Sequence, residues 1–432
     1  MKMPQHLSVE EGHLNIGGID TTALAGAYGT PLYVTDLDRI TGNYRRFRDC
    51  LSERYPQVQV LFAAKANGNL AVMQALAREG AGADVFSSGE LDLALRAGMK
   101  PELLLFNGSS KSRSDLARAV EAGVRVSVDS LDELTQLDAA AAEAGKTAEI
   151  AFRVNPALEV PTHPKIATGL RTSKFGIPAE EISAAYAEAL ACEHIEPVGI
   201  HCHIGSQILE VEPFARAAGV MVDVAREVTD IGVRLRFVDV GGGLGIPYHH
   251  DTDPAPTPEE YAAAVMPVFL DGIAECGIDP AFWVEPGRWL VGDSSVLLVG
   301  VNSVKRAHRT FVNVDAGFNL LARPTMYDAY HEVIVANRAA EPADGTYTVA
   351  GPICETGDLL AQDRPLPAPR AGDLIAVLDA GAYGFSMSSQ YNSRPRCAEV
   401  AVSGGRHALM RRAESLDDIT ATMTDPAPLW KR

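Results

Sequence analysis

The fold is decided by an alternation that starts at residues 59–86, which read QVLFAAKANGNLAVMQALAREGAGADVF. The apolar run Gln59–Ala64 is typical of a short buried strand, and Gly82–Phe86 is typical of a second one. Between them, Asn69–Glu79 has apolar residues at helical spacing, and Gly80 directly after it suits a helix C-cap. A strand, a helix and a strand in this order favour a parallel sheet.

The alternation continues to about residue 288. The strand-like runs are Gln59–Ala64, Gly82–Phe86, Leu103–Asn107, Arg125–Asp129, Glu149–Val154, Val198–Ile204, Arg236–Val240 and Phe282–Glu285. The helix-like segments are Asn69–Glu79, Gly89–Arg96, Lys111–Glu121, Leu131–Glu143, Ala179–Ala191, Val211–Thr229 and Pro258–Glu275. Eight βα repeats over about 250 residues predict a (β/α)8 barrel.

A doubly wound open sheet would use the same alternation. The polar residues that end the runs distinguish the two folds, because an open sheet gathers its ligands at one switch point, whereas a barrel collects them from all strands onto one face. Such residues end many different runs here: Lys65, Asp84, Asn107, Asp129, Asn155, His203 and Glu285. The barrel is therefore the favoured fold.

The sequence after Arg288 has runs typical of β-strands and few helical patterns. These runs are Ser295–Val304, Thr310–Asp315, Tyr347–Ala350, Asp373–Leu378 and Cys397–Ser403, and the proline-rich segment 365–369 is expected to be a loop. We therefore expect an α/β chain in which residues 37–288 form the barrel and residues 289–432 form a C-terminal all-β domain. Residues 1–36 are expected to contribute to the β domain, with His13–Ile16 as a strand.

Length and composition exclude several classes of protein. The chain has 432 residues, which is too long for one ordinary core. Its net charge of −18 argues against a nucleic-acid partner, which needs a basic face. No run approaches the ~20 consecutive apolar residues of a membrane helix. No apolar secretory segment lies within residues 1–18, so a cytoplasmic location is expected. The six cysteines contain no CxxC pair, so neither a zinc site nor a disulfide scaffold is indicated.

Lys65 ends the first strand-like run. Only 9 of the 38 basic residues are Lys, so a Lys at a buried strand end points to amine chemistry. Arg keeps its proton, whereas a desolvated Lys loses it and can attack a carbonyl carbon. Lys65 is therefore a candidate for a covalent bond to an aldehyde cofactor. On this residue alone, a snorkelling lysine at a strand end is the alternative.

Three further strand ends carry candidate ligands. The run 239–245, which reads DVGGGLG, is either a cradle of N–H groups for a phosphate or a tight turn without a ligand. Glu285 is a carboxylate at a buried strand end, and its partner is either a local Arg or a protonated ring nitrogen. His201 and His203 alternate at the strand period and so share a face. They could bind zinc, although no third ligand stands at a suitable spacing, stack on a flat cofactor with Ser206 on its phosphate, or be core histidines.

Three stretches of the β region are dense in small and polar residues, which favours loops that reach an active site. They are GPICETGD at 351–358, AGAYGFSM at 380–387 and YNSRPR at 391–396. With AAKAN around Lys65, HCHIGSQ, the GGG run and EPGR, and with THPKIATG at 162–169 and SKFG at 173–176, they stand in a recognisable order and spacing. From about residue 30 to 400 the chain resembles the diaminopimelate decarboxylases.

The resemblance implies an alanine-racemase-like barrel that binds pyridoxal 5'-phosphate, with no metal, in a homodimer with shared active sites. The implied catalytic residues are Lys65, which carries the cofactor, His203 on the ring face, Glu285 at the pyridine nitrogen and Cys354 as proton donor. The implied cofactor site comprises Lys65, Asp84, His203, Ser206, Gly241, Gly242, Gly243, Glu285, Gly287, Arg288 and Tyr383. The implied substrate contacts are Arg288, Arg323, Tyr327, Glu355 and Tyr383. Cys354 and Glu355 are implied to reach into the partner's site.

The implied reaction is decarboxylation of meso-2,6-diaminopimelate to L-lysine and CO2, the last step of lysine biosynthesis. A carboxylate such as Glu285 keeps the ring nitrogen protonated, and this favours decarboxylation over racemisation. A thiol can then protonate the substrate carbon. The alternatives are a decarboxylase for ornithine, arginine or carboxynorspermidine, and a non-catalytic regulatory homologue. Arg323 favours a substrate with a second carboxylate, and intact Lys65 and Cys354 argue against the regulatory homologue.

Overall fold

The computed structural model describes residues 3–426, which divide into two compact units. The first unit is Leu37–Ser294, and the second combines Met3–Asp36 with the chain from Ser295 onward. Each unit has its own strands and its own core and is described by itself. Within the described residues, no helix combines the length and apolar character needed to span a bilayer.

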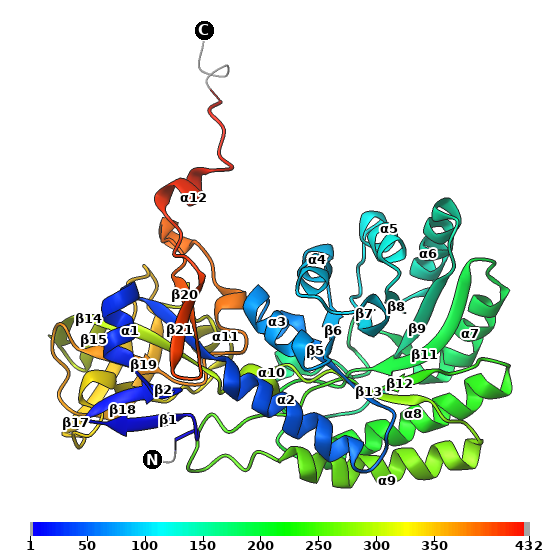
Figure 1. The fold of residues 1–432 in the computed structure, drawn as a ribbon, viewed down its shortest axis with the longest axis horizontal. Helices are drawn as coiled ribbons and strands as arrows, with labels where there is room; N and C mark the ends of the chain where they lie inside the picture. Colours follow the sequence, from blue (N-terminus) through cyan, green and yellow to red (C-terminus); the bar gives the residue numbers. More distant parts are fainter. Residues whose placement is uncertain (1–2, 427–432) are drawn as a thin grey trace. The chain divides into compact units, whose positions relative to one another are not determined.

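The strands of the first unit close into a parallel barrel (Figure 1). In residues 37–294 the ring runs β9-β11-β12-β13-β5-β6-β7-β8 and returns to β9, so no strand edge stays open. The ring strands are β5 (Val58–Ala63), β6 (Gly82–Val85), β7 (Leu104–Phe106), β8 (Arg125–Val128), β9 (Ala148–Asn155), β11 (Ile195–Cys202), β12 (Phe237–Asp239) and β13 (Ala281–Val284). The short strand β10 (Ile177–Pro178) adds to the end of β9. The predicted (β/α)8 barrel is confirmed, and the open sheet is excluded.

Helices surround the ring of strands on both sides (Figure 1). They are α2 (Leu37–Ser52), α3 (Leu70–Arg78), α4 (Ser88–Arg96), α5 (Arg113–Ala122), α6 (Leu131–Ala144), α7 (Ile182–Ala191), α8 (Glu212–Asp230) and α9 (Pro258–Cys276). All except α2 coincide with predicted helical segments. Helix α2 precedes the first barrel strand. Its buried residues follow helical spacing, so the sequence contains the signal for this helix: Ile40, Tyr44, Phe47 and Leu51.

The first unit ends later than the predicted boundary at Arg288. The short helix α10 (Arg288–Val291) follows β13 and belongs with the barrel because it is tied to α2. The side-chain amide of Asn43 in α2 donates to the carbonyl of Leu290 at 3.1 Å. Arg39 forms an ion pair with Asp293 at 2.6 Å. Because of these contacts, the first unit extends to Ser294.

The barrel interior is layered, because alternate residues of each strand point inward. An apolar floor is formed by Leu61, Leu105, Ala151, Val198, Phe237 and Trp283. The rings of Phe237 and Trp283 stack with their centroids 4.1 Å apart. Two residues further along these strands, Asn107, Arg153, Asp239 and Glu285 are all buried. Together with Asp84, Ser127 and His201 they form what we call the polar layer.

The second unit is a β-sheet domain, as expected. Its large sheet has the order β18-β17-β15-β14-β4-β20-β21, and β19 pairs with β14 and β16. The strands are β4 (Leu32–Asp36), β14 (Ser295–Arg306), β15 (Thr310–Val314), β16 (Val333–Val335), β17 (Gly345–Ala350), β18 (Leu359–Leu366), β19 (Leu374–Val377), β20 (Ala398–Ser403) and β21 (Arg406–Arg411). A small sheet holds β1 (Leu7–Glu10), β2 (His13–Ile16) and β3 (Ile19–Asp20). The helices are α1 (Thr21–Tyr28), α11 (Arg323–Tyr327) and α12 (Leu416–Thr420).

Two local expectations differ from the structure of the second unit. His13–Ile16 is a strand, but it pairs within the small sheet, and the N-terminal strand of the large sheet is β4. The proline-rich segment does not begin as a loop, because β18 continues to Leu366 and pairs Pro365 with Thr346. Strand β18 is at the edge of its sheet, where a residue without an N–H group is tolerated.

Candidate active site

Lys65 lies just after β5, in a short 3-10 turn at the mouth of the barrel. Its Nζ forms an ion pair with Asp84 at the end of β6 and lies 4.4 Å from the centroid of the Phe86 ring. Asp84 is completely buried. Burial raises the pKa of Asp84 and the Glu285 carboxylate adds to this rise, while Lys65 opposes both. The two predicted residues Lys65 and Asp84 are thus in direct contact.

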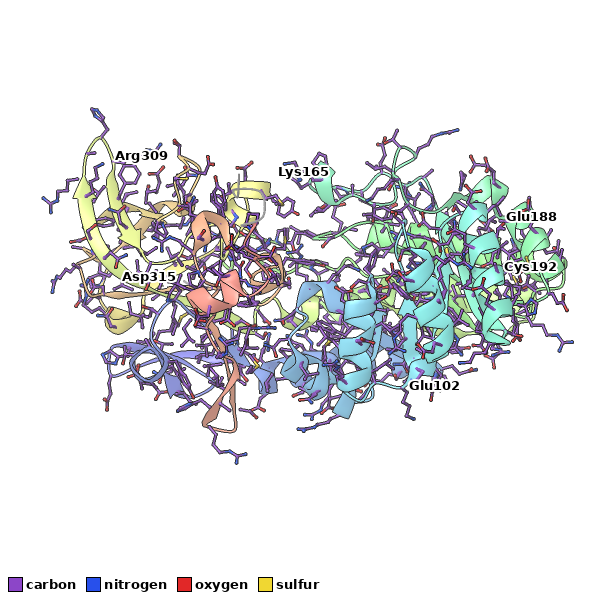
Figure 2. The ribbon with its side chains drawn as sticks, turned by 90° about the horizontal axis from the view of Figure 1, so that it is seen from above. Glu102, Lys165, Glu188, Cys192, Arg309 and Asp315 are labelled. Atoms are coloured by element: carbon purple, nitrogen blue, oxygen red, sulfur yellow. The ribbon has the colours of Figure 1, made fainter. Side chains whose placement is uncertain are left out.

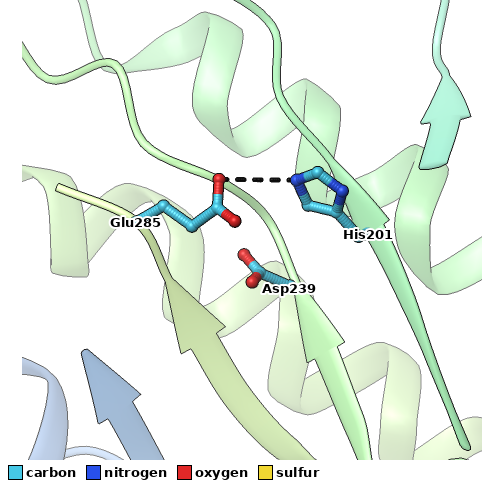
Figure 3. Close-up of side chains that lie close together, drawn as sticks. All are labelled: His201, Asp239 and Glu285. Atoms are coloured by element: carbon cyan, nitrogen blue, oxygen red, sulfur yellow. Dashed lines mark ion pairs between the residues drawn. The ribbon is translucent and has the colours of Figure 1, made fainter. Parts of the chain in front are cut away.

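Asn107 joins two carboxyl groups of the polar layer. Its Nδ2 donates to Asp84 Oδ1 at 2.6 Å and to Glu285 Oε1 at 2.8 Å. The other oxygen of Glu285 lies 3.4 Å from His201 Nε2, and Figure 3 shows this contact as a dashed line. The Nδ1 atom of His201 lies 2.8 Å from Ser127 Oγ. A chain of polar contacts therefore crosses the barrel beneath Lys65.

The pKa values of Glu285 and Asp239 shift in opposite directions although the two residues are neighbours. Burial alone would raise the pKa of Glu285, but His201 and Lys65 outweigh it and lower this pKa to about 2. Burial raises the pKa of Asp239 well above its ordinary value, and the charge of Glu285 adds to the rise. Asp239 Oδ1 accepts from the N–H of Gly241 at 2.8 Å, and Oδ2 is buried without a hydrogen-bond partner. These shifts keep Glu285 ionised, whereas they make ionisation of Asp239 less favourable.

The two histidines of the predicted pair do not act as one site. His201 joins Asp239 and Glu285, and one ligand atom of each lies within 4.8 Å of the others (Figure 3). These are the partners that the spacing around His201 could not show, because they come from other strands. His203 lies past the end of β11, and its Nδ1 accepts from the N–H of Gly242 at 3.0 Å, so its proton is on Nε2.

His203 is a neutral imidazole. Burial lowers the pKa of His203 well below its ordinary value, and the positive charge of Lys65 lowers it further. A neutral ring presents a flat face without a charge to desolvate, which suits stacking on another flat ring. A neutral His203 is compatible with the stacking role, which stays a prediction.

A cluster of hydrogen-bond donors lies near the start of α10. Arg288 Nη1 donates to Tyr248 Oη at 2.7 Å, and Arg288 Nη2 donates to Ser206 Oγ at 3.0 Å. A Cβ at Gly287 would lie only 3.0 Å from the Cβ of Ala63, so glycine allows α10 to approach the end of β5. A guanidinium beside hydroxyl groups is a favourable phosphate site. Tyr248 is a residue that sequence reasoning missed, since no local pattern marks it.

The predicted glycine run packs tightly against neighbouring strand ends. A Cβ at Gly242 would lie 2.0 Å from the carbonyl oxygen of Glu285, so only glycine fits there. The N–H groups of Gly241 and Gly242 already donate to Asp239 and His203. This leaves Gly243 as the member of the run that is suited to an anion.

The second unit holds the predicted residue Arg323 in a buried position. Its Nη1 lies 2.7 Å from His331 Nε2, and His331 Nδ1 lies 2.8 Å from the carbonyl oxygen of Leu378. A carbonyl oxygen only accepts, so the His331 proton is on Nδ1 and Nε2 accepts from Arg323. Tyr327 is half-buried at the end of the same helix, α11, and Tyr383 is half-buried with a φ of 57°.

Cys354 and Glu355 are exposed in the segment between β17 and β18, and both contact the turn at Tyr391–Ser393. The N–H of Cys354 donates to Asn392 Oδ1 at 3.1 Å, and Asn392 Nδ2 lies 3.2 Å from Cys354 Sγ. Tyr391 Oη donates to Glu355 Oε1 at 2.9 Å. Hydrogen bonds with Glu355 and Cys354 raise the pKa of Tyr391 to about 12.

The predicted site residues thus fall into two groups. The barrel brings together Lys65, Asp84, His203, Ser206, Gly241, Gly242, Gly243, Glu285, Gly287 and Arg288. The β unit holds Arg323, Tyr327, Cys354, Glu355 and Tyr383. Residues without a predicted role that contact these groups include Asn107, His201, Asp239, Tyr248, His331, Tyr391 and Asn392.

Comparison with known proteins agrees with both the barrel and its chemistry. Residues 37–292 match the family described as pyridoxal-dependent decarboxylase, pyridoxal binding domain. A diaminopimelate decarboxylase of Archaeoglobus fulgidus is 52% identical over 412 residues, which cover 95% of this chain and 97% of the relative. That of Methanothermobacter thermautotrophicus is 46% identical over 425 residues and 98% of each chain.

A solved structure extends the similarity to three dimensions. The crystal structure of diaminopimelate decarboxylase from M. jannaschii in complex with L-lysine is 36% identical, with a TM-score of 0.93. The similarity covers 98% of this chain and 99% of that chain. The chain therefore belongs to the pyridoxal-dependent decarboxylase family and, within it, to the diaminopimelate decarboxylases.

Proposed function

We propose that the chain decarboxylates meso-2,6-diaminopimelate to L-lysine and CO2, the last step of lysine biosynthesis, with pyridoxal 5'-phosphate as cofactor. The observation that carries this proposal is the Lys65 amine at the mouth of a closed barrel, above a buried and ionised Glu285. The names of the relatives and the lysine complex of the M. jannaschii enzyme support the amino-acid substrate.

The barrel residues fit this cofactor. Lys65 supplies a primary amine for its aldehyde, and His203 supplies a neutral flat ring beside it. Arg288, Ser206 and the N–H of Gly243 are suited to its phosphate. When bound, the cofactor supplies an electron-accepting ring for the electron pair that the departing CO2 leaves behind.

The protein's own groups set the protonation states that this chemistry needs. Glu285 is held ionised, so it would keep a proton on a pyridine nitrogen bound beside it. Asp84 contacts the Lys65 ammonium and is the nearest carboxylate to take its proton when the amine must be neutral. Burial and the charge of Glu285 raise the pKa of Asp239, which disfavours a second negative charge next to Glu285.

The β unit supplies most of the substrate contacts in this proposal, and the barrel supplies Arg288. Arg323 offers a planar fork to the far carboxylate of the substrate, and Glu355 offers an anion to the far ammonium. Tyr327, Tyr383 and Arg288 are assigned to the remaining polar groups. Cys354 is assigned as the acid that protonates the substrate carbon after CO2 leaves.

We further infer a homodimer with shared active sites. Cys354 and Glu355 are exposed on their own chain, so they are available to a second copy. In this arrangement Cys354 of one copy completes the site that holds Lys65 in the other copy. The cytoplasmic location stays a prediction from the sequence.

The test is CO2 release from a panel of amino acids by the purified protein loaded with pyridoxal phosphate. We expect meso-diaminopimelate to be the preferred substrate and L-lysine to be the product. Substrates that lack the far carboxylate cannot make the contact assigned to Arg323, and rejection of analogues that lack a recognised polar group reaches ~10⁴-fold. Equal turnover of ornithine or arginine would contradict the role given to Arg323. A visible absorption band that disappears in Lys65→Ala separates an enzyme from a non-catalytic homologue.

A further inference from the structure

The side chain of Asn392 contacts Cys354 twice. Its Oδ1 accepts from the backbone N–H of Cys354 at 3.1 Å, and its Nδ2 lies 3.2 Å from Cys354 Sγ. The two contacts come from opposite ends of one planar amide, so they fix the backbone and the sulfur of Cys354 together. Asn392 lies in the YNSRPR stretch, for which the predicted site gives no role.

The backbone around Asn392 is arranged for this contact. Asn392 and Ser393 have φ values of 58° and 55°, a left-handed pair that is uncommon outside glycine and that Asn tolerates better than most residues. The opposing segment is held by the buried Asp358, whose carboxylate accepts from the N–H groups of Ile353 and Phe318, both at 2.7 Å. The local backbone therefore positions Asn392, and Asp358 holds the segment that carries Cys354.

We propose that Asn392 is a positioning residue for Cys354, which fixes the sulfur and donates a hydrogen bond to the thiolate that remains after proton transfer. The role of that thiolate in catalysis rests on the proposed function, whereas the effect of Asn392 on the thiol does not.

The chemistry favours an amide at this place. When Cys354 protonates the substrate carbon, the S–H bond breaks, a C–H bond forms, and the electron pair of the S–H bond stays on sulfur. A donor aimed at that sulfur stabilises the charge where it develops. Asn392 Nδ2 is such a donor at every pH, because an amide neither gains nor loses a proton in this range. Solvent returns the proton to sulfur for the next cycle.

The test uses two substitutions that keep the left-handed backbone. Asn392→Gly removes the amide, and Asn392→Asp keeps an acceptor for the Cys354 N–H but replaces the donor by a carboxylate. Ser393→Gly is the matched control, because it changes the neighbouring left-handed residue without removing the amide. Tyr391 and Glu355, the titratable groups beside the thiol, are unchanged in all three variants.

The measurement is the rate of alkylation of Cys354 by iodoacetamide across pH 6 to 10, on the holoenzyme, read from the Cys354 peptide by mass spectrometry. The pH midpoint of the curve reports ionisation, whereas the plateau at high pH reports accessibility, which the smaller side chain of glycine changes. Cys192, after α7 on the outer side of the barrel, is the internal reference (Figure 2). A lost hydrogen bond to an anion should slow alkylation about ten-fold below the midpoint.

We expect the midpoint to move to higher pH in Asn392→Gly and further in Asn392→Asp, and to stay in place in Ser393→Gly. An unchanged midpoint in the two Asn392 variants, with native thermal unfolding, would overturn the proposal. The alkylation curve needs no substrate, so it separates this proposal from the proposed function. With meso-diaminopimelate, both variants should lower kcat about ten-fold with little change in KM, since the contact acts after substrate has bound.

Discussion

Replacing Asn107 by Leu should show how much the stability of the barrel depends on the amide that bridges Asp84 and Glu285. Leu has the branched outline of Asn, although it is larger, and it cannot donate, so Asn107→Leu removes the hydrogen bonds to Asp84 at 2.6 Å and to Glu285 at 2.8 Å. A hydrogen bond to a charged group contributes about 1.5–3 kcal/mol. Two such losses would cost about 3–6 kcal/mol if both carboxylates stayed ionised, and protonation of one of them limits the cost.

The cost in free energy of unfolding should therefore depend on pH. Loss of the amide raises the pKa values of Asp84 and Glu285 in the folded variant, so the folded variant binds more protons than the wild-type fold. Folding raises the pKa of Asp84, and such a carboxyl destabilises the fold as pH rises from its unfolded pKa through its folded pKa. Asp84 therefore sets the difference between pH 5 and pH 8, whereas Glu285, whose folded pKa is about 2, contributes at lower pH. We expect a loss of about 3 kcal/mol at pH 8 and a smaller loss at pH 5.

The assay is urea unfolding followed by tryptophan fluorescence, because Trp283 and Trp289 are both buried in the barrel. Asn313→Leu is the control, since this amide donates only to the neutral and exposed Ser303 hydroxyl, and its loss should cost less than about 0.5 kcal/mol. Binding of pyridoxal phosphate should weaken in Asn107→Leu as well, because Glu285 loses a contact that fixes its carboxylate. A stability loss that is absent, or equal at pH 5 and pH 8, would refute the reasoning.

Three further predictions concern the proposed reaction. Borohydride reduction of the protein with pyridoxal phosphate should label Lys65, and a label on Lys174 or Lys305 instead would contradict its assignment. Arg323→Lys keeps the charge but loses the planar fork, so KM for meso-diaminopimelate should rise about ten-fold or more, measured by lysine formation, and an unchanged KM would remove Arg323 from the substrate site. Mixing Lys65→Ala with Cys354→Ala chains should restore part of the activity through hybrid dimers, and verified hybrids without activity would count against shared sites.

Much of the barrel could be predicted because its strands are short apolar runs that end in polar residues, and each run is bounded by a helix. Helix α2 was missed because it precedes the first strand, outside the βα rhythm. In the second unit, β18 was not predicted, and residues 365–369 were expected to form a loop, since prolines usually break strands. Its place at a sheet edge removes that objection, and pairing across a sheet is not visible in a local sequence.

The sequence predicted at which strand ends the site residues lie, but it did not predict which atoms they contact. A barrel brings all its carboxyl-terminal strand ends to one face, so residues such as Lys65 and Glu285 could be placed on it from their strands alone. Which atoms meet depends on neighbours far apart in sequence. Asn107 bonds to a carboxylate 178 residues away, and Asn392 bonds to a thiol 38 residues away. The spacing of His201 and His203 suggested a shared role, yet the end of β11 falls between them and separates their contacts.

Three carboxyl groups of the barrel titrate in a similar way in solution, but different neighbours shift their pKa values in the fold. Asp84 contacts the Lys65 ammonium, His201 and Lys65 lower the pKa of Glu285, and burial together with the charge of Glu285 raises the pKa of Asp239. Glu285 is therefore the carboxylate whose surroundings most favour a negative charge, and its role at a ring nitrogen stays a prediction. The positions of their strands bring the carboxyl groups together, but the pKa of each group depends on its neighbours. For this reason, substitutions at Asn107 and at other residues that never touch the cofactor should change its electronic state.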